Sequence, residues 1–176
     1  YQPSRGLGDV YKRQEYTPYE FKWTTDQEAR TKLWKARHDA FWAAMALVPG
    51  GIAMSTDVCV PISRLAECVE DTRRDIEESD IFAPIVGHVG DGNFHTLPIA
   101  LPDDVEAWKR IQSFVERLSE RAIAMDGTCT GEHGIGQGKI KYLRQEMGPA
   151  VDMMIAVKQA LCLLYTSDAA DDDTRV

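Results

Sequence analysis

The chain has 176 residues, of which 44% are hydrophobic and 27% are charged, values typical of a globular protein with one sizeable core. Its 28 acidic and 20 basic side chains give a formal net charge of −8, which argues against a nucleic-acid surface or an anionic membrane partner. No apolar run in the sequence approaches the roughly 20 residues that a membrane-spanning helix needs.

Both ends of the chain contain stretches that look foreign to a natural protein. The sequences "DVYKRQ" (9–14) and "CLLYTS" (162–167) can be encoded by one DNA segment and its reverse complement, as expected for a sequencing adapter translated at both ends. We therefore expect residues 1–14 and 162–176 to be translated adapter that packs poorly, and residues 15–161 to be an incomplete domain of a longer protein. A natural tail rich in Asp and Ala is the alternative.

The first predicted helix covers residues 25–47 and ends at the Pro49-Gly50 pair. One of its faces collects side chains spaced three or four apart, namely Leu33, Arg37, Phe41 and Ala44. Trp34, Trp42 and Met45 are expected to be core residues.

The remaining segments alternate between strand and helix patterns. In order, they are a strand at 52–61, a helix at 62–79, hairpin arms at 83–89 and 94–101, a helix at 103–125, and a helix at 140–161 interrupted near Gly148-Pro149. Antiparallel strands that alternate with long helices predict an α+β fold, with the helices on one face of the sheet.

The predicted hairpin turn is flanked by two of the four histidines. In "VGHVGDGNFH" (86–95), Asp91-Gly92 is typical of a two-residue type I′ turn, which needs positive φ at both positions. Counting outward from this turn places His88 opposite His95, with Cβ atoms about 4.5–5.5 Å apart on one face. Two imidazoles this close can bind one metal ion; the alternative is a pair of hydrogen-bonded histidines beside a turn.

A third ligand is needed for a divalent ion, and Glu132 in "TGEHGIG" is the best candidate. The glycines around it let the backbone approach other groups closely. A His/His/Glu set with an open position is typical of a catalytic metal such as Zn or Mn. If the segment is extended here, His133 points away from Glu132 and can act as a general base.

The glycine-rich segment 127–139 does not match a phosphate-binding loop. A P-loop requires Ser or Thr after its lysine, but Ile140 follows Lys139, and the glycines also miss the dinucleotide-binding spacing. A hydrolase that uses the same His/His/Glu metal is the main alternative enzyme class. A binding module without catalytic activity is the third alternative.

Arg37 is a charged residue on the apolar face of the first predicted helix. A buried charge must be paired, and the bidentate guanidinium group suits a substrate carboxylate. The alternatives are an internal partner such as Asp57, or a surface position with only the stem buried.

Three stretches taken together resemble one family. "TDVCVPISRL", "IVGHVGDGNFH" and "GTCTGEHGIGQGK" are similar to the C-terminal, substrate-side domain of FAD-linked D-lactate dehydrogenases, and the likeness covers residues 33–161. The wider group is of the vanillyl-alcohol-oxidase type and includes glycolate oxidase subunits and D-2-hydroxyglutarate dehydrogenase. "ARHDAFWAA" and "TDVCVPISRL" favour the D-lactate branch.

The resemblance implies roles for particular residues. By position, His88, His95 and Glu132 correspond to metal ligands, His133 to the catalytic base and Arg37 to the carboxylate-binding arginine. It also implies an FAD-linked oxidase C-terminal domain with ferredoxin-like elements. Most FAD contacts are expected in an N-terminal domain that this sequence does not include.

The activity implied by the resemblance is oxidation of D-lactate to pyruvate with hydride transfer to FAD. The expected partners are a small 2-hydroxy acid and a cytochrome or quinone-type electron acceptor, with no nucleic acid. The expected location is the cytoplasm or the periphery of the inner membrane, and mitochondrial in a eukaryote. The chain alone is expected to be inactive, because it lacks most of the flavin site.

Overall fold

The computed structural model describes residues 24–161. The chain divides into two compact units between Ala43 and Ala44. The predicted adapter segments, 1–14 and 162–176, lie outside the described residues. Within the described range, every helix is too short or too polar to span a bilayer.

The first helix, α2 (Gln27–Ala46), forms as predicted but is not buried. None of its residues, all of which the structure describes, is buried, and the side chains of Trp34 and Trp42 are 62% and 68% exposed. The prediction that these tryptophans are core residues is therefore wrong. An alanine-rich helix forms through local propensity and backbone hydrogen bonds, neither of which requires burial.

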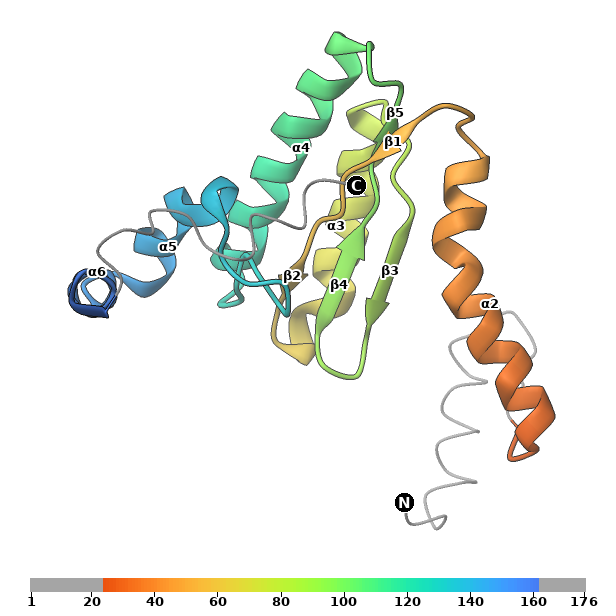
Figure 1. The fold of residues 1–176 in the computed structure, drawn as a ribbon, viewed down its shortest axis with the longest axis horizontal. Helices are drawn as coiled ribbons and strands as arrows, with labels where there is room; N and C mark the ends of the chain where they lie inside the picture. The colour runs from red at the N-terminus through yellow and green to blue at the C-terminus, as the bar shows by residue number, and fades with distance from the viewer. Residues whose placement is uncertain (1–23, 162–176) are drawn as a thin grey trace. The chain divides into compact units, whose positions relative to one another are not determined.

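The remaining elements form a mixed structure of short antiparallel strands and helices (Figure 1). In chain order they are β1 (Ile52–Ala53), β2 (Val58–Cys59), α3 (Ile62–Glu78), β3 (Ile85–His88), β4 (Asn93–Thr96), β5 (Ile99–Ala100), α4 (Val105–Ala124), a 3₁₀ helix (Gln137–Lys139), α5 (Ile140–Met147) and α6 (Ala150–Leu161). The predicted α+β class is confirmed.

The strand order is that of a ferredoxin-like sheet. β4 lies between β2 and β3, and an isolated antiparallel bridge joins Cys59 of β2 to Thr128 after α4. The chain thus runs β2-α3-β3-β4-α4 and returns beside β2, which is the β-α-β-β-α-β arrangement.

The predicted strand at 52–61 is divided into β1 and β2, and the predicted second hairpin arm into β4 and β5. A hydrogen bond still joins the residues between the strand pieces: the Met54 amide, between β1 and β2, donates to the Pro98 carbonyl, between β4 and β5, at 2.9 Å. Pro98 has no N–H to return that bond, so the regular ladder is interrupted at this point. Sequence periodicity does not reveal which strand position faces a proline.

One face of the β2-β4-β3 sheet packs on α3 and α4; in Figure 1, α3 lies behind the strands and α4 stands to their left. The buried cluster at this face contains Val58 and Phe94 from the strands, and Phe114 and Leu118 from α4. Both helices have one apolar face, and α4 begins at Asp104, whose carboxylate accepts from the Ala107 amide at 2.9 Å. Local sequence therefore accounts for these two helices and for the face that they cover.

The buried carboxylate of Asp75 links α3 to α4 through hydrogen bonds. Asp75 of α3 accepts hydrogen bonds from Arg117 and Arg121 of α4, at 2.6 and 2.5 Å for the shortest contacts. Burial by itself raises the pKa of Asp75, but the two guanidinium groups outweigh it and hold this pKa below its ordinary value. The pair positions the helices that support the sheet.

Candidate metal and catalytic site

The functional side chains lie on the sheet face that the helices do not cover. Because side chains alternate along a strand, Val58 and Phe94 point to the core while Asp57 and His95 point to the opposite face. Asn93 lies on this second face as well, opposite His88. The glycine-rich segment after α4 approaches this face.

The hairpin register differs from the prediction. His88 pairs with Asn93, and His95 pairs with Val86. The turn is a four-residue loop at 89–92: the Asp91 amide donates to the His88 carbonyl at 2.8 Å, and Gly92, not Asp91, has positive φ (77°). The Gly92 carbonyl also accepts a hydrogen bond from the amide of Val60, the residue after β2, at 3.0 Å. Sequence periodicity does not predict this contact.

This shift preserves the face on which the two histidines lie. His88 is paired two residues away from its predicted partner, and a two-residue change leaves a side chain on the same side of the sheet. The rings of His88 and His95 are diagonal neighbours with centroids 5.9 Å apart. The prediction that His88 lies directly opposite His95 is therefore wrong, but the two histidines do lie on the same face of the sheet.

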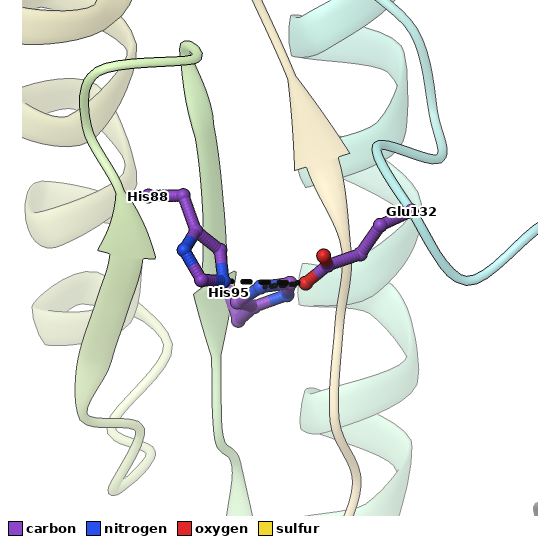
Figure 2. Close-up of side chains that lie close together, drawn as sticks. All are labelled: His88, His95 and Glu132. Carbon is purple, nitrogen blue, oxygen red and sulfur yellow. Dashed lines mark ion pairs between the residues drawn. The ribbon is translucent and has the colours of Figure 1, made fainter.

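Glu132 reaches the two histidines from the loop that follows α4 (Figure 2). Its Oε1 lies 3.0 Å from His95 Nε2 and 3.5 Å from His88 Nε2. One ligand atom from each residue lies within 4.8 Å of the others. Ligand atoms that bind zinc at about 2.0–2.2 Å can surround one ion at such separations.

The hydrogen bond on the other side of the His95 ring orients it toward this point. Nδ1 of His95 lies 2.9 Å from the Thr56 carbonyl, which can only accept, so Nδ1 carries the proton. Nε2 is then the ring nitrogen that faces Glu132, and it is the atom that can bind a metal ion when it carries no proton. Such a carbonyl partner is the usual arrangement behind a metal-binding histidine.

His133 lies beside this cluster and does not point away from it. Its ring centroid is 5.5 Å from that of His95, and its Nε2 is 4.0 Å from Glu132 Oε1. The condition of an extended segment is not met here, because residues 131–133 form a bend. The side chain is exposed, so His133 is open to a ligand that approaches the cluster.

The bend is held by Asp57, which the sequence analysis did not predict as a site residue. Its carboxylate is 2% exposed and accepts from the amides of Gly131, Glu132 and His133 at 2.8–2.9 Å. Asn93 donates to its other oxygen at 3.0 Å. Asp57 is thus bound both to the loop that carries Glu132 and to the hairpin.

The electrostatics of Asp57 follow from these contacts. Burial by itself raises its pKa, but hydrogen bonds from the backbone of His133 and Glu132, and from the side chains of Asn93 and Thr130, lower the pKa to about 2. The carboxylate is therefore ionised at neutral pH. A charged residue within an otherwise strand-like segment was the sequence feature that could have revealed it.

Lys139 closes the other end of the glycine-rich segment. Its Nζ donates to the Asp57 carbonyl at 2.8 Å, and burial lowers its pKa. Sequence reasoning used Lys139 only to exclude a P-loop and missed this contact.

Arg37 lies on α2, in the other unit, and its side chain is exposed with the guanidinium 5.8 Å from the centroid of the Trp34 ring. The face on which it lies is also exposed, since Leu33 is 62% and Phe41 43% accessible. Arg37 is therefore not a buried charge here, and its exposure agrees with the surface position that the sequence left open as an alternative. Its role as the carboxylate-binding residue stays a prediction.

The family model and the relatives that match this chain indicate the same family. Residues 8–161 match the family described as "FAD linked oxidases, C-terminal domain". The chain is 57% identical over 143 residues to a probable mitochondrial D-lactate dehydrogenase of Danio rerio, an alignment that covers 81% of this chain and 29% of the relative.

Two further relatives widen the comparison. The chain is 41% identical over 143 residues to a mitochondrial D-lactate dehydrogenase (cytochrome) of Arabidopsis thaliana, covering 81% of the chain and 25% of the relative. It is 36% identical over 140 residues to a glycolate oxidase subunit of Bacillus subtilis, covering 77% of the chain and 28% of the relative. The chain thus spans less than a third of the length of each of these relatives. Because the family match extends over most of its residues, this chain belongs to the FAD linked oxidases and represents their C-terminal domain.

Proposed function

We propose that this chain is the substrate-side part of an FAD-dependent D-2-hydroxy-acid dehydrogenase that oxidises D-lactate to pyruvate. The observation that carries the proposal is the convergence of His88, His95 and Glu132 within 4.8 Å, with His133 beside them, in a domain of this family. The relative with 57% identity has the name of a probable D-lactate dehydrogenase, which favours lactate as the substrate. The family match also favours this function over the metal-dependent hydrolase that the ligand set alone allows.

In this proposal, His88, His95 and Glu132 hold a divalent ion, zinc or manganese. The donor set fits: two imidazoles and one carboxylate leave a coordination position open, and the Thr56 carbonyl fixes the His95 tautomer that can ligate. When bound, such an ion supplies Lewis acidity that lowers the pKa of a hydroxyl group. A cluster of hydrogen-bonded histidines without metal is the alternative that a titration with zinc distinguishes.

The remaining roles belong to His133 and Arg37. His133 accepts the proton of the substrate 2-hydroxyl at its ring nitrogen as the C2 hydride leaves, so that the C2–O bond becomes the carbonyl of pyruvate. Arg37 binds the substrate carboxylate through two parallel N–H donors. FAD, when bound, supplies the two-electron acceptor for that hydride.

The electron acceptor and the location follow the names of the relatives. A relative named as a cytochrome-type enzyme favours a cytochrome as the acceptor, with a quinone as the alternative, and the mitochondrial names favour that compartment if the source is eukaryotic. Glycolate and D-2-hydroxyglutarate are the alternative substrates within the same family. The similarity to a glycolate oxidase subunit keeps glycolate among the substrates to be tested.

The substrate is tested in a protein that carries this sequence together with a flavin-binding domain. We expect such a protein to contain FAD and to reduce a dye acceptor with D-lactate but not with L-lactate, because the carboxylate, hydroxyl and C2 hydrogen must all be oriented at once. Initial rates with D-lactate, L-lactate, glycolate and D-2-hydroxyglutarate measure this preference. A preference for L-lactate would contradict the proposed function, and a preference for glycolate would change its substrate.

Substitution of Arg37 tests the proposed carboxylate contact. We expect Arg37→Ala in the same protein to raise KM for D-lactate by about 10- to 100-fold, the equivalent of a charged hydrogen bond worth about 1.5–3 kcal/mol. Because the carboxylate is bound equally in the ground and transition states, kcat should change much less. Arg30→Ala removes the same charge from the same helix and serves as the control. An unchanged KM in the Arg37 variant would remove this residue from the substrate site.

A further inference from the structure

We infer that Asp57 is a positioning residue that holds the side chains of Glu132 and His133 close to His95. The inference rests on the proposed function, because it concerns the geometry of the same metal and proton-transfer site. Asp57 itself is not assigned as a ligand or as a base. Its effect is exerted through the backbone of the loop that carries Glu132 and His133.

The contacts of the Asp57 carboxylate select one segment of the chain. Oδ2 accepts from three consecutive backbone amides, those of Gly131, Glu132 and His133, at 2.8, 2.9 and 2.9 Å. The Thr130 hydroxyl donates to the same oxygen at 3.0 Å. Two of these amides belong to the residues whose side chains form the candidate site, so any movement of the carboxylate moves those side chains.

Thr56 and Asp57 together also contact the hairpin residues of the site. The carbonyl of Thr56 fixes Nδ1 of His95 at 2.9 Å, and Asp57 Oδ1 accepts from the Asn93 side chain at 3.0 Å. Residues 56 and 57 therefore contact both the element that carries His95 and the loop that carries Glu132. A single rigid segment sets the separation of two groups that must meet at one ion.

Gly131 provides the space that this arrangement needs. A Cβ at this position would lie 1.8 Å from Asn93 Nδ2 and 2.9 Å from Asp57 Oδ1. Any larger residue must therefore push the loop away from Asp57 or displace the Asn93 side chain. In contrast, a Cβ on Gly138, in the same glycine-rich segment, would meet nothing within 4 Å.

The first test is Zn²⁺ binding to the 176-residue chain by calorimetry. Asp57→Asn keeps the size of the side chain but turns one acceptor into a donor that faces the donors of the loop or of Asn93. We expect it to weaken Zn²⁺ binding by about 10- to 100-fold, the range for groups that orient metal ligands. Asp91→Asn, an equal charge change in the exposed hairpin turn, should bind as the unmodified chain does. Equal Zn²⁺ affinity of a folded Asp57→Asn variant would overturn the inference.

A second pair of variants leaves every charge in place. Gly131→Ala should weaken Zn²⁺ binding in the same way as Asp57→Asn, while Gly138→Ala should leave it unchanged. Thermal unfolding of all four variants shows which of them are folded, and if Asp57→Asn does not fold, the Gly131→Ala result decides. The Co²⁺ absorption spectrum adds a test that loss of stability alone would not change, because a displaced Glu132 alters the coordination of the ion. An unaltered spectrum and affinity in Gly131→Ala would contradict the inference.

Backbone amide exchange separates this inference from the proposed function. If the unmodified chain binds no Zn²⁺, the metal part of the proposed function fails, but the three amides bonded to Asp57 can still be observed by NMR. They should exchange slowly in the unmodified chain and much faster in Asp57→Asn, with the core amides of α4 unaffected. Equal exchange of these three amides in both proteins would overturn the positioning role independently of any metal.

Discussion

Replacement of His133 by Ala is expected to lower kcat for D-lactate by about 10²- to 10⁴-fold, the usual contribution of a general base. The expectation applies to a protein that carries this sequence together with its flavin-binding domain. The His133 ring lies beside His95, and its Nε2 is 4.0 Å from Glu132 Oε1. His133 takes up the substrate proton in the transition state and not in the ground state, so its removal should lower kcat and change KM little.

The His133 measurement requires a control for the loss of a histidine in general. His38→Ala on α2 removes an exposed imidazole from a residue that is not among the proposed ligands, base or substrate contacts, and it should retain full turnover. Flavin and metal content are measured in each variant, so that a fall in kcat is not confused with the loss of a bound group. Near-normal turnover of D-lactate by His133→Ala would show that another residue, or water, is the base.

Replacement of His95 by Ala is expected to weaken Zn²⁺ binding by more than about 100-fold, beyond the range for residues that only orient ligands. His95 is the least exposed of the three candidate ligands, and its Nε2 makes the shortest contact with Glu132, at 3.0 Å. Its removal leaves two ligands, which are too few for a usual divalent site. Zn²⁺ affinity should also fall as the pH is lowered, because protons compete for the imidazole and carboxylate ligands.

Calorimetry on the 176-residue chain measures this affinity, with His38→Ala again as the matched control. Glu132→Gln provides an independent check, because it keeps the shape of the side chain but removes the negative charge. Both His95→Ala and Glu132→Gln should also lose D-lactate oxidation when placed in the flavin-containing protein. Zn²⁺ affinity that survives the removal of His95 would contradict the proposed ligand set.

Local sequence determined most of the helices. The apolar spacing of α3 and α4 places their buried faces correctly, and Asp104 begins α4 through a bond to the Ala107 amide at 2.9 Å. The predicted interruption at Gly148-Pro149 separates α5 from α6, with Gly148 at a positive φ of 53°. These features depend on residues within a few positions of each other, which is why the sequence alone predicts them.

The sequence motifs also determined the family and the face of the sheet that carries His88 and His95. Strand periodicity assigns faces even when the register is wrong, because a change of two residues leaves every side chain on its original side. The resemblance to FAD-linked oxidases likewise depended only on short stretches of consecutive residues. The family match over residues 8–161 confirms it.

The tertiary structure alone decided the register of the hairpin and the role of Asp57. The hairpin turn is bonded to a residue distant in sequence, through the Gly92 carbonyl and the Val60 amide, and the Glu132 amide is bonded to a carboxylate 75 positions earlier in the chain. The apolar spacing of α2 likewise did not predict that the helix is exposed. A helical pattern predicts which side chains share a face but not what covers that face. Contacts between residues distant in sequence are set by how the elements pack, and no local pattern encodes that packing.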